Sequence, residues 1–381
     1  MRIFYADYAI GGTNLSVLEK VYLIISDEGY VIRLTRHKPK NSVEEQFEDA
    51  VIVPGFVNLH THIGDSFAKE VAYGLEVKRA VGTSDSVKKR LLESVDFETF
   101  KLGVKNAVNE MLSSGTTTFV DFREGGVDGV KMLKNVLEEL RIRSIVLGRG
   151  TNGNWAEVLM ISDGFGIGNI NKLDDNKLKT ICRMAYSQRK YFAFHASETM
   201  NLRIDSTRKF GMSDLTRGLL ITKPSFIVHA TYANISEIKL LARERIPIVI
   251  CPRANAYFGS GVPPLKEFFQ NGLIMGIGTD NVMANSPDIF REFDFLVRQL
   301  RLESVTVDPK EILSLATKNA VKILNLPLGS LEEGFHADFF VFDLNKPNVA
   351  GMDDIIKAIV LRGKSENVTA TFIDGKKVFQ R

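Results

Sequence analysis

The sequence predicts an α/β protein in which a (β/α)8 TIM-like barrel carries a small β-sandwich formed by the two ends of the chain. Three observations support this fold class. Short apolar segments alternate with helical segments through the middle of the chain, as in parallel α/β folds. Both terminal segments alternate between apolar and polar residues, as strands do. Polar side chains suited to chemistry follow several central apolar segments, and a barrel brings the carboxyl ends of its strands to one face.

The two ends of the chain predict one composite domain. Each end contains three strand-like runs, and the turn signal Asp374-Gly375 joins the last two. Neither end has enough apolar residues to form a core alone, so we expect residues 1–52 and 331–381 to form one β-sandwich domain and residues 53–330 to form the barrel. The strand-like runs are 2–6, 21–26, 30–34, 337–343, 370–373 and 377–379.

The central part of the chain predicts eight strands with helices between them. Strands are identified as short apolar runs, and helices as longer segments with apolar residues at helical spacing. Eight parallel strands are the number that closes a barrel of this kind. We expect strands near 56–62, 116–122, 144–149, 158–163, 191–196, 225–230, 246–251 and 273–279, and helices near 98–113, 129–140, 174–188, 234–244 and 263–271.

The composition is that of an ordinary soluble globular protein, with 44% hydrophobic and 25% charged residues among 381. The net charge of +3 gives no reason to expect nucleic acid or a membrane as a partner, and we expect the basic run Lys88-Lys89-Arg90 to be solvated surface. Two cysteines, Cys182 and Cys251, fit a reducing compartment. Because the chain shows no signal-peptide pattern and no bilayer-spanning apolar run, we expect a cytoplasmic location.

Five side chains predict a metal site. His60 and His62 are two residues apart in a predicted strand, so both imidazoles point to the same face. His195, His229 and Asp280 each lie at the end of another predicted strand. Each residue alone could be an ordinary buried or turn residue, but strand ends of one barrel meet, which favours a shared site. Imidazoles with one carboxylate suit divalent zinc or iron better than calcium or magnesium.

A series of short motifs runs in order over nearly the whole chain, at 54–62, 114–118, 195–199, 251–255, 278–280, 316–320, 329–334 and 337–338. In this order the motifs resemble the amidohydrolase superfamily, and within it the aminohydrolase branch of cytosine, guanine and adenosine-type deaminases and triazine chlorohydrolases. The resemblance implies a metal-dependent hydrolase that acts on carbon–nitrogen bonds other than peptide bonds.

The resemblance also implies the metal number and the residue roles. Binuclear members bridge two metals with a carboxylated lysine or a glutamate from the fourth strand, and the predicted fourth strand here ends without either. We therefore expect one divalent metal, with zinc favoured over iron, that makes hydroxide available to release ammonia from an amino-substituted heterocycle. Glu198 would be the proton shuttle, and His229 and Asp280 would act beside it. The implied ligands are His60, His62, His195 and Asp280.

Candidate substrate contacts lie on loops at the same barrel face. Arg149 and Trp155 follow the third predicted strand, and Arg253 and Asn255 follow the seventh. We expect a small-molecule substrate, and a homo-oligomer is compatible with the sequence. The stretch after His62 departs from the pattern of nucleoside deaminases in this branch, which leaves purine, pyrimidine, triazine and non-aromatic substrates open.

Two other functions stay open at this point. A cyclic amide or lactam hydrolase, similar to imidazolonepropionase or dihydroorotase, would yield a ring-opened carboxylate without ammonia. A non-catalytic metal-binding protein of the same fold would bind without hydrolysis, although such proteins usually lose metal ligands and none is lost here.

Overall fold

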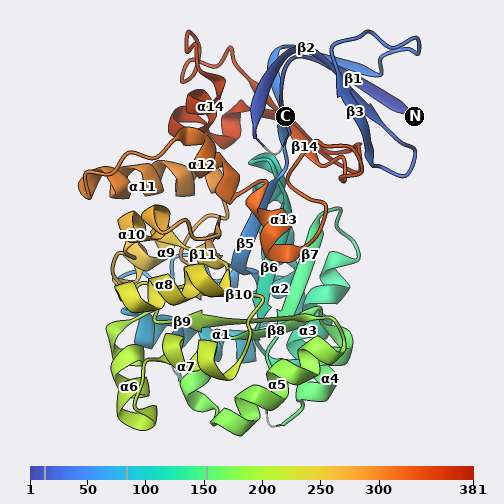
Figure 1. Ribbon diagram of the computed structural model, residues 1–381. Coiled ribbons are helices and arrows are strands. Elements are labelled where there is room, and N and C mark those ends of the chain that lie inside the picture. Colours follow the sequence, from blue (N-terminus) through green and yellow to red (C-terminus); the bar gives the residue numbers. More distant parts are fainter. Residues whose placement is uncertain (13, 83–84, 152) are drawn as a thin grey trace.

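The computed structural model describes residues 1–12, 14–82, 85–151 and 153–381. Its strands form a seven-stranded sheet built from both ends of the chain and a nine-stranded parallel sheet built from the middle. Figure 1 shows the first sheet at one end of the molecule, with both termini in it, and the second sheet surrounded by helices. The fold is a TIM-like barrel with a separate β-sheet part, as the sequence predicts in outline.

The terminal sheet has the strand order β16-β15-β14-β4-β1-β2-β3. Its strands are β1 (Arg2–Gly11), β2 (Ser16–Ile25), β3 (Val31–Thr35), β4 (Glu45–Pro54), β14 (Phe339–Asp343), β15 (Val368–Ile373) and β16 (Lys376–Gln380). The rings of Phe4 on β1 and Phe372 on β15 have centroids 5.2 Å apart, although β4 and β14 stand between these strands. Neighbouring strands are about 4.8 Å apart, so a flat sheet would not allow this contact. In place of a two-sheet sandwich, the structure has one sheet that curls over its own core.

The central sheet is parallel throughout, with the order β12-β11-β10-β9-β8-β7-β6-β5-β13. Its strands are β5 (Phe56–His62), β6 (Thr116–Arg123), β7 (Arg143–Gly148), β8 (Gly164–Ile167), β9 (Tyr191–Ala196), β10 (Phe226–His229), β11 (Ile248–Ile250), β12 (Met275–Ile277) and β13 (Asp280–Asn281). β12 pairs with β11, whereas β13 pairs with β5 through Asp280 opposite Thr61. The last segment of this sheet thus returns to its first strand, which curls the sheet into a barrel.

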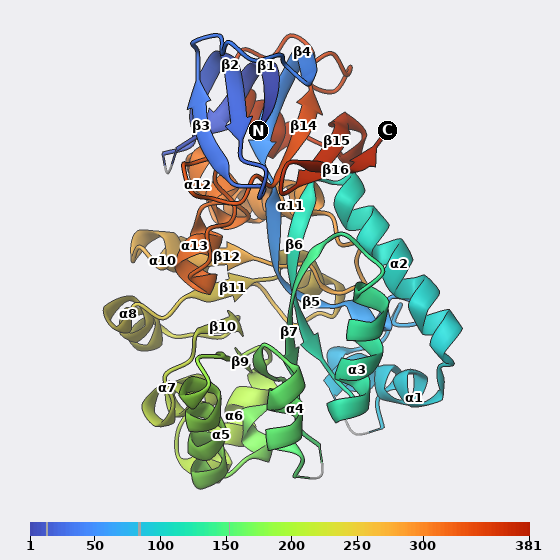
Figure 2. The ribbon, with the colours of Figure 1, turned by 90° about the vertical axis from the view of Figure 1, so that its right-hand side faces the viewer.

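Helices follow the strands and cover the outside of the central sheet (Figure 2). In α2, Asp96 accepts a hydrogen bond from Thr99 N at the N-terminus, and one apolar face is buried. The α-helices are α1 (Val87–Ser94), α2 (Phe97–Ser113), α3 (Gly126–Leu137), α4 (Trp155–Ile161), α5 (Asp175–Ser187), α6 (Met200–Phe210), α7 (Asp214–Ile221), α8 (Ile235–Glu244), α9 (Pro252–Tyr257), α10 (Leu265–Gln270), α11 (Ile289–Leu302), α12 (Pro309–Leu315), α13 (Asn319–Leu324) and α14 (Ile355–Lys357). Short 3-10 or π segments are η1 (Ile63–Asp65), η2 (Lys78–Gly82), η3 (Ile170–Lys172), η4 (Ala358–Arg362) and η5 (Ser365–Asn367).

The fourth barrel strand differs from the prediction. The segment predicted as a strand, 158–163, begins inside α4, which buries Trp155, Val158 and Leu159 on one helical face. The strand is β8, a four-residue segment that begins at Gly164, two residues after the helix cap Ser162. No lysine or glutamate occurs in β8 or in the two residues after it. The reason for expecting a single metal therefore applies to the observed strand as well.

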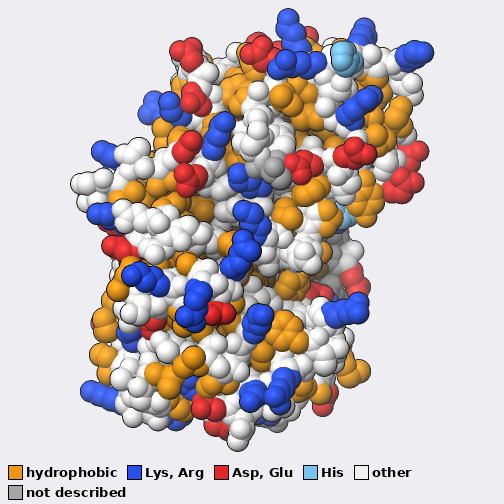
Figure 3. Space-filling model, in the orientation of Figure 1, with side chains coloured by type: hydrophobic (Ala, Val, Ile, Leu, Met, Phe, Trp, Pro, Cys, Tyr) orange, Lys and Arg blue, Asp and Glu red, His pale blue; other side chains and the backbone are white. Residues whose placement is uncertain are grey.

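The surface carries mixed charge. On the face in Figure 3, basic, acidic and hydrophobic side chains are interspersed, in keeping with the net charge of +3. Across the described residues, no helix combines the length and the apolar character that a membrane crossing requires.

Candidate metal centre

Four histidines and one aspartate converge at the carboxyl ends of the parallel strands. His60 and His62 come from β5, His195 from β9, His229 from β10 and Asp280 from β13. All five are buried, with exposed fractions of 7% or less. TIM-like barrels place their active sites at this face. The structure thus brings together the five residues that the sequence predicts to share a site.

The distances within this cluster fit a metal ion. His60 Nε2 lies 3.2 Å from His195 Nε2 and 3.4 Å from Asp280 Oδ1, and His62 Nε2 lies 3.5 Å from the same oxygen. Ligand atoms about 2.1 Å from a tetrahedral zinc would be roughly 3.4 Å from one another. Asp280 Oδ1 is buried and has no hydrogen-bond partner among the described residues, which suits an atom that binds a ligand. His229 Nε2 is further away, at 4.0 Å from Asp280 Oδ2.

Three of the four imidazoles are held at the nitrogen that points away from the cluster. The Nδ1 atoms of His62, His195 and His229 lie 2.9 Å from Phe122 O, 3.1 Å from Ile167 O and 3.0 Å from Asn255 Oδ1, respectively. A neutral imidazole that donates from Nδ1 keeps a lone pair on Nε2. Three Nε2 lone pairs therefore face the region where Asp280 arrives, which is the orientation that metal-binding histidines need.

The buried environment keeps His60 and His195 neutral, and the neighbouring imidazoles keep Asp280 ionised. Burial lowers the pKa of His60 to about 3 and lowers the pKa of His195 well below its ordinary value. Burial alone would raise the pKa of Asp280, but the adjacent imidazole of His60, 3.4 Å away, and the other nearby imidazoles outweigh it and hold this pKa well below its usual range. Neutral imidazoles and an ionised carboxylate are the forms that bind a metal.

The backbone at the cluster adopts conformations that are rare for residues with a Cβ. The φ angles of His229, Ala230 and Asp280 are 73°, 50° and 62°. Non-glycine residues in this left-handed region carry about 1–3 kcal/mol of strain each, and they persist where the surrounding structure imposes them. Such residues gather at functional sites, which agrees with the placement of the cluster.

Glu198 lies just beyond the ligand cluster and is positioned by its neighbour. It follows Ser197, which has a φ of 45° and donates from N and Oγ to the carboxylate of Asp214 at 2.7 Å and 3.0 Å. Burial raises the pKa of the Glu198 carboxyl; the carboxylates of Asp280 and Asp214 add to this effect, and the nearby imidazoles oppose it. A carboxyl with a raised pKa can both take up and release a proton.

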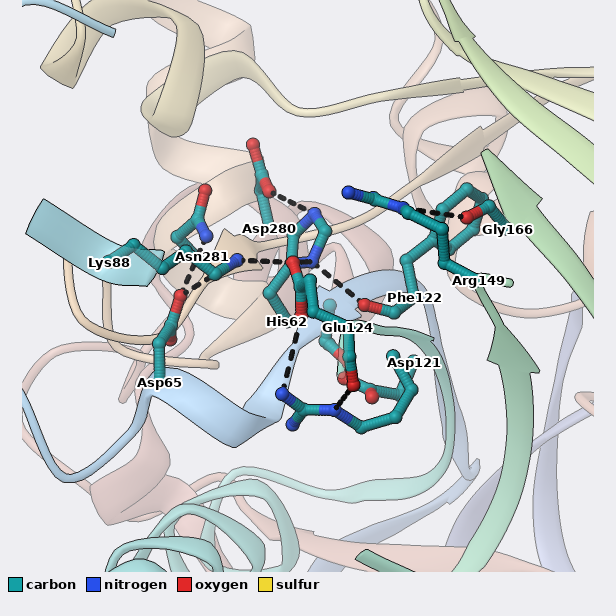
Figure 4. Close-up of polar contacts among 12 residues, drawn as sticks. His62, Asp65, Lys88, Asp121, Phe122, Glu124, Arg149, Gly166, Asp280 and Asn281 are labelled. Carbon is teal, nitrogen blue, oxygen red and sulfur yellow. Dashed lines mark hydrogen bonds and ion pairs between the residues drawn. The ribbon is translucent and has the colours of Figure 1, made fainter. Parts of the chain in front are cut away.

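A charged network lies behind His62 (Figure 4). Glu124, directly after β6, places Oε1 2.8 Å from His62 Nδ1 and 2.7 Å from Lys88 Nζ. The Lys88 side chain is only 5% exposed, and its Nζ also lies 3.3 Å from Asp65 Oδ2. The expectation that the basic run around Lys88 is solvated surface is wrong for this residue, because α1 turns it inward toward two carboxylates.

Arg149, a predicted substrate contact, faces the cluster. It is the residue after β7, and its Nε donates to Gly166 O at 3.4 Å. Figure 4 shows its guanidinium pointing toward His62 and Asp280. Burial lowers the pKa of Arg149, and the carboxylates of the site oppose this effect. The side chain therefore brings a positive charge close to the ligand cluster.

The other three predicted contacts are engaged with groups of the protein. Trp155 is 7% exposed, and its ring packs against Phe165 with centroids 5.4 Å apart, so its side chain belongs to the core. Arg253 pairs with the buried carboxylate of Glu292 at 3.2 Å. Asn255 is the acceptor that holds His229. Of these three residues, Asn255 thus contacts a residue of the cluster, whereas Trp155 packs in the core and Arg253 is held by an ion pair.

Sequence reasoning missed several residues of this region, among them Glu124, Lys88 and Cys251. Glu124 and Lys88 form the network behind His62, and Cys251, directly after β11, offers a sulfur within 4.8 Å of ligand atoms of His229 and Asp280. Glu124 could have been found, since it is a carboxylate directly after a central strand. Lys88 lay hidden in a basic run, and Cys251 followed an apolar run that suggested only a small buried side chain.

Comparison with known proteins identifies the family. The sequence profile of the amidohydrolase family matches residues 51–378. An uncharacterized protein of Methanocaldococcus jannaschii is 35% identical, over 92% of this chain and 93% of the relative. The chain belongs to the amidohydrolase family and is a hydrolase acting on carbon–nitrogen bonds.

Two further comparisons match proteins that are named deaminases. A 5-methylthioadenosine/S-adenosylhomocysteine deaminase of Thermococcus onnurineus is 27% identical, over 97% of this chain and 92% of the relative. The crystal structure of an adenosine deaminase from Xanthomonas campestris with bound zinc superposes with a TM-score of 0.88 at 21% identity, covering 98% of this chain and 92% of that one. The structural match shows that the two proteins share the fold.

Proposed function

We propose that this protein is a mononuclear, zinc-dependent aminohydrolase that releases ammonia from an amino-substituted heterocycle. The main support is the spacing of the buried ligand atoms at the strand ends. His60 Nε2 lies 3.2 Å from His195 Nε2 and 3.4 Å from Asp280 Oδ1, which in turn lies 3.5 Å from His62 Nε2. These separations match those that a tetrahedral zinc imposes on its ligands. The proposed ligands are His60, His62, His195 and Asp280.

A single metal suits these residues better than a pair. All groupings of potential ligands within the described residues draw on the one cluster, and β8 supplies no lysine or glutamate that could bridge two ions. Zinc binds imidazole and carboxylate ligands and can take a fifth ligand, so three imidazoles and one carboxylate would still leave a position for water. The zinc in the adenosine deaminase of the same fold supports this choice.

The residues around the ligands support proton transfer. A divalent metal at this place would lower the pKa of a bound water to about 7. Glu198, whose pKa is raised by burial, would take a proton from the water and deliver it to a ring nitrogen of the substrate. Asp280, which is ionised and would bind the same metal, would accept the second proton of the water and pass it to the departing amino group, which leaves as ammonia. His229 would orient water or substrate by accepting a hydrogen bond at Nε2, since its Nδ1 proton is engaged by Asn255.

Adenine nucleosides are the first substrates to test. The relative from Thermococcus onnurineus is named for deamination of such nucleosides and is 27% identical to this chain. Arg149 would contact a carbonyl or anionic group of the substrate, because its guanidinium faces the cluster and within the described residues its single hydrogen bond is to Gly166 O.

Metal analysis combined with an ammonia-release screen tests the proposal. We expect one zinc per chain and ammonia from at least one member of a panel of adenine nucleosides, guanine, cytosine and aminotriazines. A ring-opened carboxylate from lactams without ammonia would instead indicate a cyclic amide hydrolase. Zinc-loaded protein without either activity would indicate a binding protein.

Glu198→Gln is the matched variant for this screen. It keeps the shape of the side chain and removes the group that carries the proton. We expect the zinc content to stay the same and the turnover rate to fall roughly 100- to 10,000-fold. Full activity of this variant would remove Glu198 from the mechanism.

A further inference from the structure

Lys88 occupies an unusual environment for a lysine. Its side chain is 5% exposed, and a buried ammonium group is unfavourable unless it is closely paired. Its Nζ lies 2.7 Å from Glu124 Oε1 and 3.3 Å from Asp65 Oδ2. One lysine on α1 therefore joins two carboxylates that come from different parts of the barrel face (Figure 4).

The first carboxylate acts on His62. Both Glu124 Oε1, at 2.8 Å, and Phe122 O, at 2.9 Å, lie within hydrogen-bond distance of His62 Nδ1. The carbonyl oxygen alone suffices to decide which ring nitrogen carries the proton. The carboxylate adds a charge-assisted interaction, which makes the imidazole a stronger electron donor at Nε2.

The second carboxylate acts on the strand that carries Asp280. Asp65 accepts hydrogen bonds from Asn281 Nδ2 at 2.7 Å and from Met283 N at 2.9 Å. Asn281 follows Asp280 directly, and in the pairing of β13 with β5 it stands opposite His62. Lys88 thus pairs with both carboxylates, one beside His62 on β5 and one beside the segment that carries Asp280 on β13.

We propose that Lys88 and Glu124 are positioning residues that strengthen zinc binding without touching the metal. Lys88 holds Glu124 against His62 and, through Asp65, holds the segment that carries Asp280. The inference rests on the metal site of the proposed function. According to this inference, the metal affinity also depends on α1, a helix that contributes none of the proposed ligands.

Chelator competition with the full chain measures the effect on zinc affinity. Glu124→Gln keeps the shape of the side chain but removes its charge, and we expect it to weaken zinc binding roughly 10- to 100-fold. Lys88→Met should weaken zinc binding in the same direction. Since Lys88 acts in part through Glu124, the double variant should lose less affinity than the product of the two single losses.

Glu237→Gln is the matched control. Glu237 is also buried and ion-paired, to Arg203 at 2.7 Å, but its hydrogen bonds within the described chain go to none of the ligand residues. Thermal unfolding of each zinc-free variant shows whether it is folded under the assay conditions. Glu237→Gln should lose stability while its zinc affinity stays at the wild-type value.

Equal zinc affinities of the wild type and Glu124→Gln would overturn the inference, as would an equal loss in Glu237→Gln. If Glu124→Gln does not fold, Lys88→Met decides, and unchanged affinity in that variant overturns the inference. A wild-type chain that binds no zinc would remove the proposed function together with the inference. Equal affinities would remove the inference alone.

Discussion

Asn255 holds the imidazole of His229 in one orientation. Its Oδ1 lies 3.0 Å from His229 Nδ1, while its Nδ2 donates to Thr231 Oγ1 at 3.2 Å. The amide thus bridges the histidine and the hydroxyl of Thr231. With Oδ1, an acceptor, facing the ring, His229 donates from Nδ1 and presents a lone pair at Nε2.

Asn255→Ala should lower turnover roughly 10- to 100-fold because His229 loses the partner that orients it. Zinc content should stay the same, since Asn255 supports a residue outside the proposed ligand set. Steady-state kinetics together with metal analysis check both expectations. Asn255→Asp keeps an acceptor and should retain more activity. Loss of zinc from Asn255→Ala would show that His229 is itself needed for metal binding.

Acidification should destabilise the zinc-free protein. Burial lowers the pKa of His60 from 6.5 to about 3, and it shifts His195 in the same direction. Between these values the unfolded chain binds more protons than the folded chain, so the free energy of unfolding falls as the pH falls from 6.5 toward 3. Above 6.5 these histidines add no pH dependence, because they are neutral in both states.

Urea unfolding of the zinc-free protein at a series of pH values measures this slope. His60→Asn should reduce it, whereas His37→Asn changes an exposed side chain and serves as the control. The same slope in His60→Asn as in the wild type would contradict a contribution from the buried imidazole.

Asp214 should matter for turnover and not for zinc. Its carboxylate accepts both hydrogen bonds that hold Ser197, and Ser197 positions Glu198. Asp214→Ala should lower kcat with little change in zinc content, and Asp214→Asn, which keeps one acceptor, should recover part of the rate. Asp174→Ala removes a cap of α5 that accepts from Lys177 N at 2.8 Å. We expect Asp174→Ala to lose about 1 kcal/mol of stability and to keep full activity. An equal loss of rate in both alanine variants would contradict a role for Asp214 in placing Glu198.

Much of the fold could be predicted because strands and helices carry different apolar periods. The expected strands 56–62 and 191–196 coincide with β5 and β9. β8 could not be predicted, since a four-residue strand with two glycines has little apolar signal beside the apolar helix α4. The curl of the terminal sheet was also beyond reach, because alternation shows which residues face a core and not how the sheet bends.

The proposed ligands could be predicted because parallel strand ends meet at one face. The residues that hold these ligands in place could not be predicted in the same way. Lys88 and Lys89 are neighbours in one basic run, yet one is buried and the other is exposed, and only the docking of α1 distinguishes them. The contact of Glu124 with His62 likewise depends on β6 lying beside β5, which no local pattern contains.

Gly278 should be required for zinc binding because it lets β12 and β13 pass close to β5. A Cβ at this position would lie 2.6 Å from His60 Cβ and 2.7 Å from His60 N, closer than non-bonded carbon atoms approach. Neither neighbour is the end of a flexible side chain, so Gly278→Ala should displace Asp280 from His60. We expect weaker zinc binding and a lower melting temperature.

Gly272→Ala separates the two effects. Gly272 has a φ of 62°, and no atom lies within 4 Å of an added Cβ. This variant should lose roughly 1–2 kcal/mol through backbone strain while keeping its zinc affinity. If Gly278→Ala bound zinc as tightly as Gly272→Ala, the strands would have to move apart without displacing the zinc ligands. The close approach of Gly278 to His60 would then contribute to packing and not to zinc binding.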